Sequence, residues 1–216
     1  MPLLHALIAS VSLAATGDAK DRYFDCLLLV EKDIELGRRA AQIWADEGGG
    51  ANAAHCLALA DIAAGFGKLG AARLEEIAKR PDAGDNLARA RLYAQAAEAW
   101  LEVSEIENAA TAIAAAFEYA PDAVELHFTD ARVRAANKDW HHVISAISKA
   151  EKVKAVSAEG YILRGRARLE IGDTEGAAED TVSALSLDPT NIDALTLRGD
   201  VQRAGVQIDV SLTSSQ

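Results

Sequence analysis

The chain has 216 residues, half of them apolar and 5% aromatic, so it is long enough to bury a sizeable core. Alanine is frequent and there are only four prolines, a composition that predicts an all-α protein. The net charge of −11, with no dense basic stripe, argues against nucleic acid as a partner.

The N-terminal segment is the most apolar part of the chain. Residues 3–15 are apolar or small, which is the length of a signal-peptide core but too short to span a membrane. We expect residues 1–19 to be a signal peptide, so that the mature protein is periplasmic or secreted and has no integral membrane segment. The segment lacks a Lys or Arg at its start, so the alternative is an uncleaved first helix in a cytoplasmic protein.

The following segment shows helical spacing interrupted by helix breakers. Apolar periodicity predicts two degenerate helix pairs, in residues 20–50 and 51–89. Within these pairs the pattern predicts helices at Arg22–Lys32, Glu35–Asp46 and Ala71 to about Lys79. The last of these stops early because Pro81 follows it.

From residue 90 the sequence repeats every 34 residues. Residues 158–191 place an aromatic at the fourth position, small residues at the eighth, twentieth and twenty-seventh, Gly-Asp at the fifteenth and sixteenth, and proline at the thirty-second. These residues are Tyr161, Gly165, Ala177, Ala184, Gly172, Asp173 and Pro189. Mostly small residues recur at the same places in the two preceding periods, as at Ala97, Ala109 and Ala116. Small side chains let paired helices approach closely, and successive pairs must stack to bury their apolar faces.

This pattern resembles the tetratricopeptide repeat (TPR) family. The resemblance implies an α-solenoid of tandem antiparallel helix pairs wound into a right-handed superhelix, which we expect to occupy residues 20–204. Its expected parts are the degenerate repeats 20–50 and 51–89, the clear repeats 90–123, 124–157 and 158–191, and a closing helix 192–204. Residues 205–216 are expected to be a flexible tail.

The segment 65–70, GFGKLG, has the G-x-G-x-x-G spacing of a dinucleotide-binding loop. Such a loop follows a strand, whereas this segment follows a helical pattern. Three periods of 34 separate Gly70 from Gly172, so we expect Gly70 to be a left-handed turn residue between two helices, while Gly65 and Gly67 ease the end of the first. A nucleotide-binding or catalytic protein that uses residues 65–70 is retained as an alternative.

The histidines form no recognisable catalytic or metal-binding pattern. His141 and His142 would point about 100° apart on a helix, and His55 beside Cys56 has no further ligand at the spacing of a structural metal site. We expect these histidines to be partly buried or at the surface. We therefore expect no enzyme activity, no metal and no cofactor.

Cys26 and Cys56 each lie on the expected first helix of a repeat. The TPR resemblance implies that successive first helices are neighbours, so the two thiols are within reach of each other. A disulfide between them would close a loop of about 30 residues, and it depends on export to an oxidising compartment. The alternative is a pair of buried free thiols.

In the TPR family the first helix of each repeat lines a concave groove that binds a peptide. Mapped onto this sequence, the candidate groove residues are Glu98, Leu101, Phe128, Arg132, Ile162, Arg166 and Leu169. The aliphatic and aromatic members would form an apolar patch beside two arginines, which can hold carboxylates bidentately. The resemblance thus implies a non-catalytic scaffold or adaptor for a protein or peptide partner.

The same arginines have an alternative role within the chain. Arg132 could pair with Glu98, and Arg166 with Asp200, as exposed ion pairs that contribute little to stability. Arg164 is expected to reach Asp180 across its own repeat and to be structural.

Overall fold

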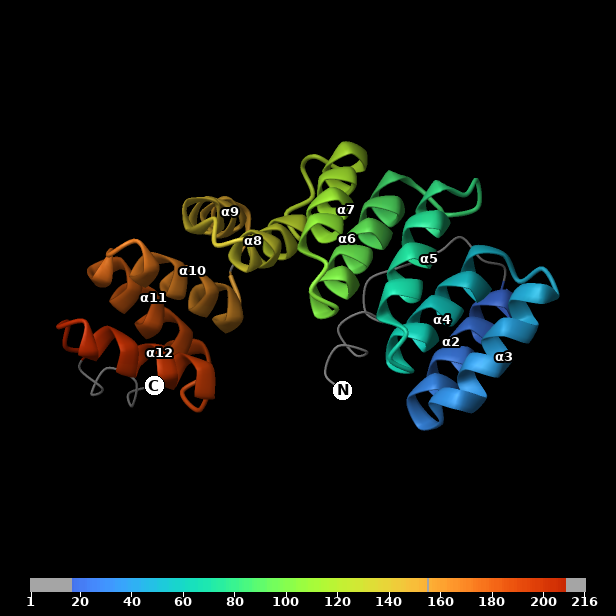
Figure 1. Cartoon of the computed structure of the whole chain (residues 1–216), viewed down its shortest axis with the longest axis horizontal. Coiled ribbons are helices and arrows are strands. Elements are labelled where there is room, and N and C mark those ends of the chain that lie inside the picture. The colour runs from blue at the N-terminus through green and yellow to red at the C-terminus, as the bar shows by residue number, and fades with distance from the viewer. Residues whose placement is uncertain (1–16, 155, 209–216) are drawn as a thin grey trace. The chain divides into compact units, whose positions relative to one another are not determined.

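The computed structural model describes residues 17–154 and 156–208, and in that part of the chain it has eleven α-helices and no strand (Figure 1). They are α2 (Gly17–Lys32), α3 (Ile34–Asp46), α4 (Gly50–Ala63), α5 (Gly67–Lys79), α6 (Asn86–Glu102), α7 (Ile106–Tyr119), α8 (Leu126–Ala136), α9 (Trp140–Val153), α10 (Ala158–Glu170), α11 (Thr174–Leu187) and α12 (Ile192–Arg203). The all-α prediction is confirmed. The expected signal peptide lies outside the described residues, except that residues 17–19 belong to the first turn of α2.

The chain divides into two compact units, residues 1–126 and 127–216. In the first unit each of α2 to α6 packs against the next helix, and α2 also contacts α4. In the second unit α10 contacts α9, α11 and α12. Each unit is therefore a stack in which a helix touches its neighbour and the next helix but one, as in a solenoid.

Side-chain caps define where many of the helices begin. A residue just before the helix accepts a hydrogen bond from the backbone N–H three residues later, which satisfies one of the donors left free at a helix start. The capping residues are Asp33, Asp85, Asp139, Ser157, Asp173 and Asn191. Asp139 and Asp173 are one 34-residue period apart, so the local signal for a second helix recurs with the repeat.

The turn between the two helices of a repeat uses a left-handed residue at a constant place in the period. Ser104, Lys138 and Gly172 have φ values of 60°, 59° and 83° and follow one another at 34-residue intervals. Gly65, with φ 87°, fills the same place between α4 and α5, but it precedes Ser104 by 39 residues (104 minus 65). Five extra residues lie between Gly65 and Ser104, most of them in α6, which is longer than α8 and α10, and they shift the register of the early part of the chain.

The expectation for Gly70 is therefore wrong. Gly70 lies inside α5 and is buried, while Gly65 is the left-handed turn residue. A Cβ on Gly70 would overlap the Ile62 side chain and lie 2.7 Å from the carbonyl oxygen of Ala58. Close approach of α4 and α5 is thus the reason for this glycine. The segment 65–70 follows one helix and enters another, so it lacks the strand that a dinucleotide loop requires.

Small residues at the recurring positions lie where helices meet. Ala97, Ala109 and Ala116 have no exposed surface, and Ala131, Ala177 and Ala184 are equally buried in the second unit. A Cβ on Gly165 would lie 2.7 Å from Cδ2 of Leu197. Close packing of helices through these positions confirms the physical argument drawn from the period, although Ala150 at the same place is only half-buried.

The residues that follow α12 pack against the second unit. After α12 the chain reverses at Gly205, whose φ is 103°. Ile208 is 8% exposed and packs with Val206 against a cluster that includes Leu197 and Val201. Residues up to 208 therefore pack against the second unit, and the flexible tail expected for residues 205–216 stays a prediction. Residues 209–216 lie outside the described part.

Candidate partner-binding surface

An exposed ion pair joins two successive first helices in the second unit. Arg166 on α10 donates from Nη2 to Oδ1 of Asp193 on α12 over 2.6 Å, and about half of the arginine side chain and two-thirds of the aspartate side chain are exposed. The alternative pairing of Arg166 with Asp200 is wrong, because Asp200 accepts from Arg203 on its own helix. Arg166 therefore stands on an accessible surface with a partner that solvent also reaches.

The three apolar groove candidates of this unit do not form one accessible patch. Ile162 is only 4% exposed and packs with Ala184, Leu185 and Ala194, so it belongs to the core. Phe128 and Leu169 are half-buried and pack against two other clusters of the unit. The position expected to line the groove is covered here because α11 and α12 both close over it.

The remaining groove candidates are divided between the two units. Glu98 and Leu101 lie on α6 in the first unit, and Arg132 lies on α8 in the second. All three are half-buried, and both Glu98 and Arg132 are engaged with other groups. Within one unit, the accessible candidates are therefore Arg166 and the exposed part of Leu169.

A disulfide joins Cys26 on α2 to Cys56 on α4. The Cys56 side chain has no exposed surface and Cys26 is 7% exposed, so the bond lies in the core of the first unit. The bond connects α2 and α4, which are the first helices of two successive repeats.

A buried polar chain lies beside this disulfide. His55 has no exposed surface, contrary to the expectation of a partly buried or surface side chain. Its Nδ1 is 2.6 Å from the Tyr23 hydroxyl and its Nε2 is 2.7 Å from Oε1 of Gln95. Burial lowers the pKa of His55 to about 4 and raises the pKa of Tyr23, so both side chains are neutral near pH 7. The adjacency of His55 and Cys56 is the one hint of this arrangement in the sequence.

Two clusters of buried charge join neighbouring helices. Arg164 on α10 lies 2.7 Å from Asp180 on α11 and 2.6 Å from Glu151 on α9, which confirms its expected structural role. In the first unit Asp61 on α4 forms ion pairs with two arginines. Nε of Arg38 on α3 lies 2.6 Å from Oδ1 of Asp61, and Nε of Arg73 on α5 lies 2.8 Å from Oδ2.

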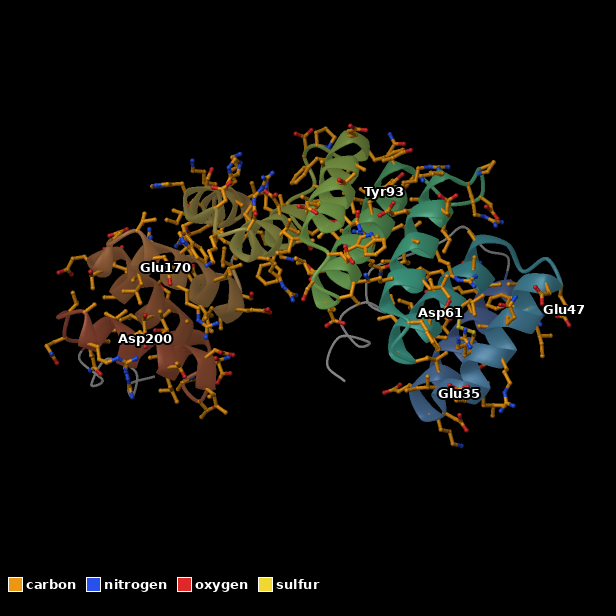
Figure 2. The ribbon with its side chains drawn as sticks, viewed as in Figure 1. Glu35, Glu47, Asp61, Tyr93, Glu170 and Asp200 are labelled. Carbon is orange, nitrogen blue, oxygen red and sulfur yellow. A yellow bond between two sulfur atoms is a disulfide. The ribbon has the colours of Figure 1, made fainter. Side chains whose placement is uncertain are left out.

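The buried charges of both clusters form ion pairs between helices. Asp61 is completely buried in the middle of the first unit, where Figure 2 labels it. Among the described residues no group of His, Cys, Asp and Glu side chains is arranged to hold a metal ion. His141 and His142 are exposed on α9.

Stacked helix pairs with a left-handed turn at a fixed place in each period define an α-helical repeat protein with the TPR fold. Comparison with solved structures finds 35 matching chains. One is MamA (residues 41 to the end) from Desulfovibrio magneticus RS-1, at a TM-score of 0.65, 15% identity, 83% coverage of this chain and 99% of that one. Another is TTC0263, a TPR protein of Thermus thermophilus, at a TM-score of 0.60, 15% identity and coverage of 86% and 98%.

The TPR domain of Arabidopsis OM64 matches a shorter part, with a TM-score of 0.52, 19% identity and coverage of 55% of this chain and 98% of that domain. No family model and no curated protein matches the sequence. The TPR resemblance is therefore confirmed at the level of the fold. In the described part of the chain, every helix is too short or too polar to cross a bilayer.

Proposed function

We propose that the protein is a non-catalytic TPR scaffold that binds a segment of a protein partner on the face formed by its first helices. The observation that carries the proposal is the exposed Arg166–Asp193 pair between α10 and α12, beside the half-buried Leu169. Its solenoid spans residues 20–204, with α2 to α11 as five helix pairs and α12 as the closing helix.

The charge on this face suggests how a partner is held. An exposed ion pair contributes only about 0–1 kcal/mol, so a carboxylate of the partner can take the place of Asp193 on Arg166 at little cost. The guanidinium then binds that carboxylate bidentately while an apolar side chain of the partner covers Leu169.

The proposed location is an oxidising compartment, the bacterial periplasm or the outside of the cell. The buried Cys26–Cys56 disulfide supports it, because disulfides persist in such compartments and are reduced in most cytosols. We propose that residues 1–19 are removed during export. Cell fractionation with intact-mass measurement tests this: a cytosolic protein that keeps its N-terminal residues and two thiols would contradict it.

The binding proposal is tested by a crosslinking pull-down from the native envelope. We expect the variant Leu169→Ala/Arg166→Glu to recover the partner about tenfold less than wild type, which corresponds to roughly 1.4 kcal/mol. A matched control, Leu187→Ala/Lys152→Glu, changes an exposed apolar and an exposed basic residue on second helices and should recover as much as wild type. Equal recovery by the first variant and the control would show that this face does not bind the partner.

A further inference from the structure

The first helix pair of the first unit exposes an apolar surface. Phe24 and Leu28 on α2 are 49% and 63% exposed, and Leu36 and Ile43 on α3 are 45% and 57% exposed. We call these four residues the terminal face. No other helix pair in the described part of the chain exposes four large apolar side chains in this way.

Helix geometry places these residues on the side of the pair that faces away from α4. Successive residues on a helix turn by about 100°, so Phe24 and Leu28 each lie about 160° from Cys26, whose sulfur is bonded to Cys56 on α4. On α3 the side that faces α4 is marked by Arg38, which pairs with Asp61.

The same argument applies to the second helix of the pair. Leu36 lies about 160° and Ile43 about 140° from Arg38 around α3. The backbone of α2 at Val30 is so close to Gly37 that a Cβ there would lie 2.6 Å from the Val30 nitrogen, so the two helices meet closely where the chain turns from α2 into α3. The four residues thus share one outward surface. Figure 2 labels Glu35 and Glu47 at the two ends of α3, along this end of the unit.

A terminal helix pair of a solenoid normally carries a polar outer surface, because no further repeat covers it. At the end of the second unit, Val206 and Ile208 cover the apolar residues of α11 and α12 instead. The terminal face has no such cover among the described residues. An uncovered apolar surface of this kind marks an interaction site.

Its size matches what a dimer needs. At roughly 200 Å² for each fully exposed residue of this size, the exposed fractions of the four residues amount to about 400 Å². A standard interface buries about 800 Å² per partner, of which somewhat more than half is apolar. The terminal face therefore supplies the apolar centre of one standard interface.

The charges around the terminal face have both signs. On α2, the exposed Asp25 and Lys32 lie about 60° and 40° from Leu28, and on α3 Glu35 and Arg39 are exposed. A strongly basic or acidic partner would meet like charge on part of this rim. A two-fold axis instead lets each side chain meet the complementary part of the same surface.

We propose that the terminal face binds the terminal face of a second copy of the chain, so that α2 and α3 of both copies form a two-fold symmetric four-helix contact. The interface is isologous: its centre is the four apolar side chains of each copy and its rim is the mixed charge around them. It is separate from the α10–α12 face and does not depend on what that face binds.

Sedimentation equilibrium of the full-length chain, residues 1–216, tests the dimer. We expect wild type to have twice the monomer mass, and Leu28→Glu and Ile43→Glu to weaken dimerisation about a hundredfold because each buries a carboxylate in the interface. Leu187→Glu is the matched control: Leu187 on α11 is 58% exposed, so it has the same side chain and nearly the same exposure as Leu28, and this variant should remain dimeric. Wild-type helix content by circular dichroism and a cooperative thermal transition show that both face variants fold.

A photocrosslinking side chain at position 43 identifies the occupant. A product that links α2 or α3 of two copies supports the proposal. A link within one chain to residues 1–16, or a link to a different protein, overturns it. A wild type that sediments as a monomer at every concentration also overturns it, as does a Leu187→Glu variant that dissociates like Leu28→Glu.

Discussion

His55 shows how the burial of a single side chain fixes its protonation state. Its imidazole lies between the Tyr23 hydroxyl and the Gln95 amide oxygen, with no exposed surface. Because Oε1 of Gln95 can only accept, Nε2 carries the proton and Nδ1 accepts from the tyrosine hydroxyl. Both ring nitrogens are satisfied only in the neutral form, so a proton added to His55 would break one hydrogen bond and place a charge in the core.

We predict a pH-dependent loss of stability that depends on His55. Its pKa is about 4 in the fold and about 6.5 in the unfolded chain, so the unfolded state binds the extra proton as the pH falls between these values. The contribution is fully present above pH 6.5 and decreases by roughly 3 kcal/mol toward pH 4. Urea unfolding at pH 7 and pH 4 measures it. His55→Gln should lose less stability over this range than wild type, and equal losses in the two proteins would contradict the prediction.

At the scale of helices, buried ion pairs fix how neighbouring elements meet. The side chains of Arg164 and Asp180 are 6% and 2% exposed, and they join α10 to α11 while Glu151 extends the contact to α9. Removing one partner of such a pair leaves an uncompensated charge in the core, whereas replacing both by apolar residues of similar volume does not.

We therefore predict that Asp180→Ala reduces the free energy of unfolding by about 3–5 kcal/mol. The double variant Arg164→Met/Asp180→Leu should lose less, because it removes the two most buried charges together. The charges that it leaves, on Arg168 and Glu151, belong to side chains that are 18% and 39% exposed and reach solvent. Asp193→Ala is the control, because it removes the exposed ion-pair partner of Arg166, which lies on α10 like Arg164. It should reduce the free energy of unfolding by less than about 1 kcal/mol. Urea unfolding of the four proteins measures these differences. A double variant as unstable as Asp180→Ala would refute the argument.

At the scale of the whole molecule, stability is distributed along the stack. Each repeat of a solenoid is stabilised mainly by its own packing and by its neighbours, so a local change affects nearby helices most. The Cys26–Cys56 bond joins α2 to α4 across a separation of 30 residues and lies entirely in the first unit. Its effect should therefore be confined to the first unit.

We predict that Cys26→Ala/Cys56→Ala lowers stability by about 3.5 kcal/mol in the chain-entropy model. Hydrogen exchange should become faster in α2 and α3 and stay unchanged in α10 to α12. A reducing agent should produce the same pattern in wild type and have no effect on the variant, which serves as the control. Faster exchange throughout both units would mean that the molecule unfolds as one cooperative body.

The sequence alone determined the features that depend on near neighbours in the chain. Ala97, Ala131 and Gly165 recur at the period, and each is buried where helices meet. Asp139 and Asp173 cap helices one period apart because capping involves only the next three residues. A disulfide between Cys26 and Cys56 was one of two alternatives that the sequence left open, and the structure contains that bond.

Only the tertiary structure decided which side chains the stacked helices bring together. The left-handed turn residue is Gly65 and not Gly70, because five extra residues move the register. The ion-pair partner of Arg166 is Asp193. The tertiary structure also buries Ile162 and Ile208. Helix period, turns and caps are set by residues a few positions apart, whereas burial and ion pairing depend on the distance and rotation between helices, which arise from the packing of every side chain between them.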